Sequence, residues 1–204
     1  MTYFDAGQFM VPLNAKAGSS SMVIAIIKRW HPAIYHSMAT GHYPEGKTLH
    51  DVQWHSLCPE LKQATRPVVI GIRNPIDRFC SGVAHFNVTV EMALDSLLNG
   101  TVISKPRRTL VFQNDIHFAP QIKTCRGETH LFRFPEHVNE MAELLDLEEF
   151  PQVNIASRPK PVLTIEETTL VADHYAEDMD LYQSITHPNT IRWFPVPDLN
   201  TDVA

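Results

Sequence analysis

Residues 68–81 read VVIGIRNPIDRFCS and join an apolar strand to a capped helix through a single cation. The apolar first part is typical of a strand in a sheet that is covered on both faces. Asn74 is a favourable N-cap and the proline after it a favourable first helical residue, so a helix is predicted over residues 75–87. Arg73 therefore stands at the carboxyl end of a strand, which is where ligands bind in open α/β sheets. A guanidinium there can bind a phosphate through two parallel hydrogen bonds.

Strand and helix patterns alternate along the rest of the chain. The apolar runs predict strands at residues 9–13, 67–72 and 129–134. Periodicity and capping residues predict helices at residues 20–30, 75–87, 89–98, 135–145 and 164–184. This alternation predicts one α/β domain over residues 1–204, a three-layer, P-loop-like arrangement with a central parallel sheet flanked by helices. Its core is expected at about residues 9–186, followed by a polar C-terminal extension.

Composition excludes several classes of protein. The 204 residues suffice for one sizeable domain, and 44% hydrophobic with 20% charged residues is an ordinary globular balance. A net charge of −6 argues against a nucleic-acid binder, which would normally be basic.

Cysteine usage and the N-terminus bear on the compartment. Cys58, Cys80 and Cys125 are scattered, with no CxxC pair, so neither a zinc site nor a disulfide framework is indicated. The chain starts without the basic and apolar segments of a signal peptide and has no apolar run long enough to span a membrane. A cytoplasmic protein with no membrane partner is the expectation.

A second candidate anion site precedes the first predicted helix. Residues 14–21 read NAKAGSSS, and such small residues let the backbone wrap closely around a ligand. The helix N-terminus offers unpaired N–H groups and the positive end of the helix dipole, to which Lys16 adds a charge. The Walker pattern places its lysine after the second glycine, whereas Lys16 precedes Gly18. The alternative for this segment is an ordinary strand–helix turn. The corresponding alternative for Arg73 is an ordinary surface ion pair. Two anion sites after two strands could instead bind one ligand that carries phosphates at both ends.

The chain resembles the sulfotransferases that use 3′-phosphoadenosine 5′-phosphosulfate (PAPS). KAGSSS at residues 16–21 resembles their 5′-phosphosulfate loop, and residues 73–86 resemble their 3′-phosphate motif. DIHFAPQ at residues 115–121 and YAEDMDLY at residues 175–182 resemble two signatures of the carbohydrate sulfotransferases. The likeness extends over roughly residues 9–186.

The resemblance implies a function and a set of site residues. The family transfers a sulfuryl group in line from PAPS to a hydroxyl or amine, generally without a metal, and releases adenosine 3′,5′-bisphosphate (PAP). Lys16 would contact the phosphosulfate and steady the leaving oxygen, while Arg73 and Ser81 would hold the 3′-phosphate. The backbone and hydroxyl cradle of the phosphosulfate would comprise Ala17, Gly18, Ser19, Ser20 and Ser21. The acceptor would be a glycan or a small molecule. The residues themselves show a basic, proline-flanked loop with Arg158 and Lys160, which could close over the 3′-phosphate or be an ordinary solvated loop.

The acceptor proton requires a base. Lys47-Thr48-Leu49-His50 resembles the family's Lys-Thr-His with one extra residue, which makes His50 the first candidate. His55 is the second candidate and His117 the third. The aromatic residues are expected in the core, with Phe118 the best candidate among them for a pocket wall: Phe79, Phe112, Phe118, Phe132 and Phe134. Asp77 and Arg78 are interpreted as surface or helix-dipole residues.

Two other functions compete with sulfuryl transfer. One is an ATP- and Mg²⁺-dependent P-loop phosphotransferase, against which the position of Lys16 and the arginine at the strand end both argue. The other is a non-catalytic protein of the same fold that binds PAP or a partner protein.

Overall fold

The fold is described from a computed structural model. It describes residues 3–12, 17, 19–39, 60–61, 65–105, 108–148, 150 and 158–196.

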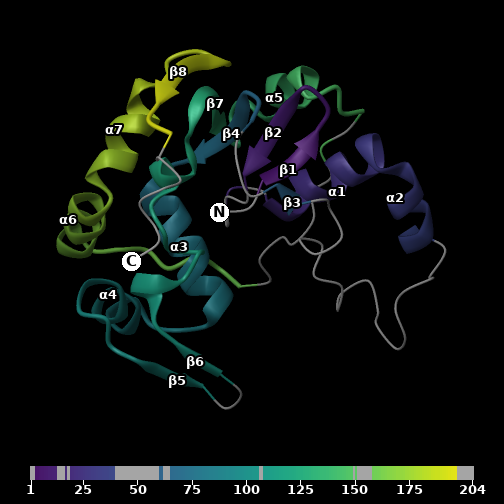
Figure 1. Ribbon diagram of the computed structural model, residues 1–204. Coiled ribbons are helices and arrows are strands. Elements are labelled where there is room, and N and C mark those ends of the chain that lie inside the picture. The colour runs from purple at the N-terminus through teal and green to yellow at the C-terminus, as the bar shows by residue number, and fades with distance from the viewer. Residues whose placement is uncertain are drawn as a thin grey trace, which may run out of the picture.

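A six-stranded mixed sheet forms the centre of the molecule, in the strand order β3-β1-β2-β4-β7-β8 (Figure 1). The strands are β1 (Tyr3–Ala6), β2 (Phe9–Pro12), β3 (Glu60–Leu61), β4 (Val68–Arg73), β7 (Gly127–Phe134) and β8 (Thr190–Phe194). The three central strands β2, β4 and β7 are parallel, as the sequence predicts, whereas β1, β3 and β8 are added antiparallel. The sheet is therefore mixed rather than wholly parallel.

The register of the parallel strands places their carboxyl ends at one edge. Val68 lies opposite Thr129 and Arg73 lies opposite Phe134, so β4 and β7 end side by side. β2 is the other neighbour of β4, with Met10 opposite Val68, and it runs in the same direction. The strands β2, β4 and β7 thus all end at the same edge of the sheet.

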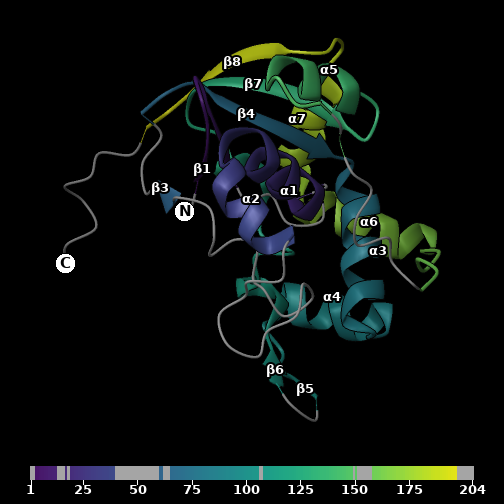
Figure 2. The ribbon, with the colours of Figure 1, turned by 90° about the vertical axis from the view of Figure 1, so that its right-hand side faces the viewer.

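Helices cover both faces of the sheet. The helices are α1 (Ser19–Trp30), α2 (Pro32–Ala39), α3 (Pro75–Phe86), α4 (Val90–Leu98), α5 (Val138–Leu144), α6 (Ile165–His174) and α7 (Ala176–Ser184). α1, α2 and α5 lie on one side, and α3, α6 and α7 lie on the other (Figures 1 and 2). A hairpin of β5 (Ile103–Lys105) and β6 (Arg108–Leu110) projects below α4 (Figure 1).

The apolar core divides along the sheet. On the α1 and α5 side, Ile26 and Met141 pack against Val69 and Phe132 of the sheet. On the α7 side, Ile70 and Leu131 of the same strands pack against Leu181. This alternation of successive residues between two covered faces is the reason β4 reads as a continuous apolar run.

Local capping signals set the helix starts that carry the site. The side chain of Asn74 accepts hydrogen bonds from the backbone N–H groups of Ile76 and Asp77, at 3.0 and 3.3 Å, and begins α3 as predicted. Thr164 and Glu167 form the predicted capping box of α6.

Three sequence predictions about elements need correction. Residues 190–194, expected in an irregular extension, form the edge strand β8. The single helix predicted over residues 164–184 is two helices that meet at Tyr175. The helix expected from Pro135 begins at Val138. Among the residues described, no helix is both long and apolar enough to span a membrane.

Candidate functional site

A cavity of about 490 Å³ opens where β4 and β7 end, within the size range of small-molecule sites. One wall is the start of α3, a second is the turn after β7, and a third is the segment before α6. The lining residues are Asn74, Ile76, Asp77, Cys80, Phe134, Pro135, Glu136, Lys160, Pro161, Leu163, Thr168 and Tyr182. We call this space the β4–β7 cavity.

Two cations converge on one carboxylate in the β4–β7 cavity. Arg73 Nε and Nη2 each lie 2.5 Å from Asp77 Oδ2, and Lys160 Nζ binds Asp77 Oδ1. The Arg73 side chain is only 14% exposed, so solvent screens this pair less than an ordinary surface pair. Burial opposes ionisation of Asp77, but the hydrogen bond from Lys160 and the charge of Arg73 outweigh it and hold its pKa below the usual value.

The far wall of the cavity carries an aromatic and an acidic side chain. The hydroxyl of Tyr182 donates to Glu136 at 2.7 Å, and the guanidinium of Arg133 lies 4.8 Å from the centre of the Tyr182 ring. Burial, with the neighbouring Glu136 carboxylate, raises the pKa of Tyr182 to about 12. Tyr182 is therefore a neutral hydrogen-bonding group at physiological pH.

The segment of residues 115–122 runs along α3 and is tied to the end of β4. The backbone N–H of Arg73 donates to Gln121 Oε1 at 3.0 Å, and Gln121 Nε2 donates to the Arg73 carbonyl at 2.8 Å. The Gln121 amide thus pairs with both backbone groups of Arg73, in the way that a strand would. It is fully buried and fixes the backbone from which the Arg73 side chain extends.

Three buried side chains hold the same segment from two sides. Arg78 of α3 donates to the carbonyls of Ala119 and Ile116, at 2.9 and 3.3 Å. Tyr175 donates to the carbonyl of Phe118 at 2.6 Å. Asp178 of α7 accepts from the backbone N–H groups of Gln121 and Ile122, at 2.7 and 2.8 Å, which partly offsets the rise in its pKa caused by burial. We call Arg78, Tyr175 and Asp178 the clamp residues.

A histidine–aspartate pair lies at the start of the clamped segment. His117 Nδ1 lies 2.6 Å from Asp115 Oδ1, which also accepts the backbone N–H of His117 at 2.8 Å. The His117 ring stacks on that of His85 in the last turn of α3, with the ring centroids 5.4 Å apart. A carboxylate on Nδ1 keeps the proton on that nitrogen and leaves Nε2 as the proton acceptor. With its side chain 28% exposed, His117 can meet a ligand from solvent.

The structure places some predicted site residues and not others. Lys16, Gly18, His50 and His55 lie outside the described residues. Ala17 is buried beside the start of α1. The three serines that follow the loop all fall in the first turn of α1, namely Ser19, Ser20 and Ser21.

The three predicted ligands of the 3′-phosphate lie near the cavity without lining it, and Arg73 reaches it through its ion pair with Asp77. Ser81 is buried in α3, next to Cys80, which does line it. Arg158 is exposed, and Lys160, two residues further on, reaches Asp77. Their roles in holding a phosphate remain predictions.

The structure corrects two of these expectations. Arg78 is 3% exposed and holds the 115–122 segment, so it is no surface residue. Phe118 is buried in the core, as expected of the aromatic residues, but Phe134 and Tyr182 form the aromatic part of the cavity wall instead. Asp77 is half-exposed in the first turn of α3, as expected of a surface or helix-dipole residue, and it also lines the cavity. The basic, proline-flanked loop around Lys160 is the sequence signal for this wall.

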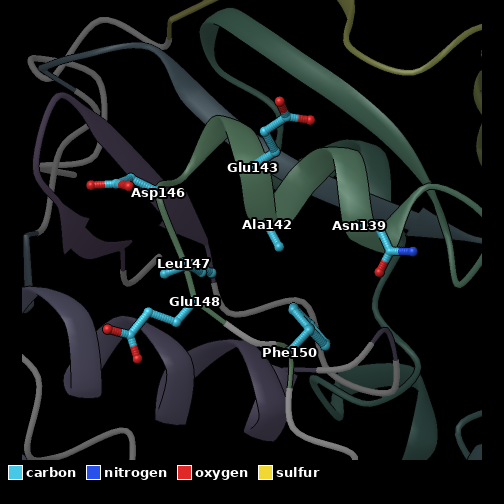
Figure 3. A pocket seen from close by; sticks show the side chains of 7 residues that line it. All are labelled: Asn139, Ala142, Glu143, Asp146, Leu147, Glu148 and Phe150. Atoms are coloured by element: carbon cyan, nitrogen blue, oxygen red, sulfur yellow. The ribbon is translucent and has the colours of Figure 1, made fainter.

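A second cavity of about 410 Å³ lies beside α5 and is acidic. Figure 3 shows the carboxylates of Glu143, Asp146 and Glu148 pointing in different directions, not towards a common centre. Asp146 is paired with Arg29, and Glu148 is paired with Lys28. These carboxylates neither converge on a metal nor favour an anion. We therefore take the β4–β7 cavity, where two cations meet at Asp77, as the candidate site.

No protein-family model, curated protein or solved structure was found to match this chain. Its function is therefore inferred from the chemistry of the β4–β7 cavity and of the Asp115–His117 pair.

Proposed function

We propose that this protein is a PAPS-dependent sulfotransferase of P-loop-like architecture that acts on a hydroxyl or amine of a glycan or small molecule. The observation that carries the proposal is the convergence of Arg73 and Lys160 on Asp77, a residue that lines a cavity at the ends of two parallel strands. The parallel neighbour β2 ends at the same edge of the sheet, and the predicted Lys16 loop follows it in the sequence. A donor with anionic groups at both ends suits two cationic positions at one sheet edge.

The residues divide the chemistry between them. Arg73 and Lys160 would bind the 3′-phosphate, since a guanidinium and an ammonium both pair strongly with phosphate oxygens. At the other end, the N–H groups of the first turn of α1, which contains no acidic residue, would face the phosphosulfate together with Lys16. Transfer breaks the bond between sulfur and the bridging phosphate oxygen and forms one to the acceptor atom. Lys16 would stabilise the charge that develops on the departing PAP.

His117 is the described candidate for the base. The Asp115 carboxylate orients its ring, and Nε2 would take the proton that the acceptor loses on attack. Its stacking partner His85 stands ten residues after Pro75, about 15 Å along α3 at 1.5 Å per residue. The β4–β7 cavity and the Asp115–His117 pair therefore lie at opposite ends of α3. His50 and His55 remain alternative bases.

Calorimetric titration with PAP, ATP and ADP tests the donor site. We expect PAP to bind in the micromolar range, about −8 kcal/mol, and Arg73→Ala to weaken it by about 2 kcal/mol or more. Arg192→Ala is the matched control, because Arg192 is an exposed arginine on the edge strand β8. ATP binding as tight as that of PAP would rule out a site built for a 3′-phosphate.

Release of PAP from PAPS in the presence of acceptors tests the reaction itself. We expect turnover without added Mg²⁺ and its loss in His117→Ala, with PAP affinity retained. Tight PAP binding with no transfer to any glycan, alcohol or amine in a broad panel would favour the non-catalytic alternative. Turnover of ATP that requires Mg²⁺ would favour a phosphotransferase.

A further inference from the structure

A single carboxylate that lines the β4–β7 cavity, that of Asp77, occupies the point where Arg73 and Lys160 meet. Asp77 Oδ2 accepts from two nitrogens of Arg73, while Asp77 Oδ1 binds Lys160, which is 83 residues away in sequence. The three side chains come from the end of β4, the first turn of α3 and the segment before α6. Two positive charges and one negative charge leave this group with a net charge of +1.

Asp77 makes the contacts that a phosphate would make. Carboxylate and phosphate oxygens pair with a guanidinium in the same manner, so one can replace the other on Arg73. Asp77 also stands in the first turn of α3, where the helix dipole favours a negative charge of either kind. Its side chain is 38% exposed and lines the cavity, which gives an incoming anion access to it and gives it room to turn away.

We propose that Asp77 is an internal counter-anion that a phosphate of the ligand displaces, and that it thereby sets how strongly the site favours a 3′-phosphorylated over a 3′-hydroxyl nucleotide. This inference rests on the proposed function, because it takes the 3′-phosphate as the displacing group. Displacement by a phosphate must break two ion pairs that Asp77 already makes, whereas a 3′-hydroxyl leaves them in place. Asp77 thus reduces the advantage of the phosphorylated ligand without abolishing it.

Removal of this carboxylate is the direct test. In Asp77→Asn the net charge of the group rises from +1 to +2, and the neutral amide competes less for Arg73 and Lys160. We expect PAP to bind about tenfold tighter and ADP, which has a 3′-hydroxyl, to change less than about twofold. Asp77→Ala should shift both affinities in the same directions. Asp180→Asn, which neutralises an exposed aspartate of α7, is the matched control for net charge.

The possible outcomes separate this inference from the proposed function. If PAP binds the wild type but binds Asp77→Asn no tighter, Asp77 is not displaced and this inference alone fails. If PAP and ADP tighten equally, the effect is general electrostatics and the selectivity claim is overturned. If neither folded protein binds PAP at millimolar concentration, the proposed function fails together with this inference, and the Arg73–Asp77 pair only stabilises the start of α3.

Discussion

At the scale of single residues, the clamp residues hydrogen-bond the backbone of the 115–122 segment. The 115–122 segment is irregular, so its backbone groups cannot all pair with a neighbouring strand, and buried groups left unpaired are costly. Arg78, Tyr175 and Asp178 supply partners from α3 and from the helices beyond it. The sequence around each gives no sign of this, because every partner lies about 40 or more positions away.

Tyr175→Phe tests the clamp at one atom. The change keeps the ring but leaves the buried Phe118 carbonyl without this donor, so we expect the free energy of unfolding to fall by about 1–2 kcal/mol. Tyr182→Phe is the control, since the Tyr182 hydroxyl bonds to the exposed Glu136 and its loss should cost less than about 0.5 kcal/mol. Urea denaturation measures both. Equal losses in the two variants would contradict a special role for the Tyr175 hydroxyl.

At the scale of elements, α3 connects the cavity to the Asp115–His117 pair. Its first turn carries Asp77, its middle packs on Phe118 through Gly82, and its last turn carries His85. Because Gly82 has no Cβ, the Phe118 ring can lie directly against the helix backbone. The position of the 115–122 segment therefore depends on a glycine that helix propensity alone would disfavour.

Gly82→Ala shows which of two opposing effects is larger. Alanine in place of glycine gains about 1 kcal/mol of helix propensity. A Cβ at this position would lie 2.7 Å from Cζ of Phe118, and such overpacking costs about 1–3 kcal/mol. We expect a net loss of about 1 kcal/mol in the free energy of unfolding, measured by urea denaturation.

The double variant Gly82→Ala with Phe118→Leu tests whether the loss comes from contact between the new Cβ and the Phe118 ring. A smaller side chain at residue 118 makes room for the added methyl group, so the two changes should be less damaging together than their separate effects predict. If Gly82→Ala were more stable than the wild type, the Phe118 side chain would move aside at little energetic cost.

At the scale of the whole molecule, β8 forms one edge of the central sheet. It pairs antiparallel with all but the last residues of β7, from Thr190 opposite Leu131 to Phe194 opposite Gly127. Without β8, β7 would present its own unpaired backbone at the sheet edge, a template for aggregation. Residues 190–194 are thus part of the fold and not a surface extension.

Truncation after Pro188 separates these two interpretations. We expect removal of β8 to lower the free energy of unfolding by at least about 2 kcal/mol, since several backbone hydrogen bonds are lost, and to promote aggregation. A chain truncated after Val196 keeps β8 and is the control. Thermal unfolding and light scattering measure the two effects. If the chain that lacks β8 were as stable as the control, residues 190–194 would be a surface extension and not a part of the fold.

Part of the candidate site could be read from the sequence. Arg73 was predicted at the end of a strand because an apolar run stops at it and a capped helix follows, and both signals are local. Lys160 was noted in a basic loop, but nothing in the sequence pairs it with Asp77. Helix-dipole and propensity rules treat Asp77 and Arg78 alike as early helix residues, whereas packing buries Arg78 and leaves Asp77 in the cavity.

The sequence by itself determined the three central strands and the starts of α3, α4 and α6. Those features depend on apolar runs and on caps whose partners lie within a few residues, so no distant part of the chain is needed to specify them. Tertiary structure alone decided the pairing of β8 with β7, although Ile191, Trp193 and Phe194 are apolar. It also decided the division between α6 and α7 at Tyr175, the burial of Arg78 and the meeting of Lys160 with Asp77. Each of these depends on groups distant in sequence, which only the folded sheet and its two helical layers bring within bonding distance.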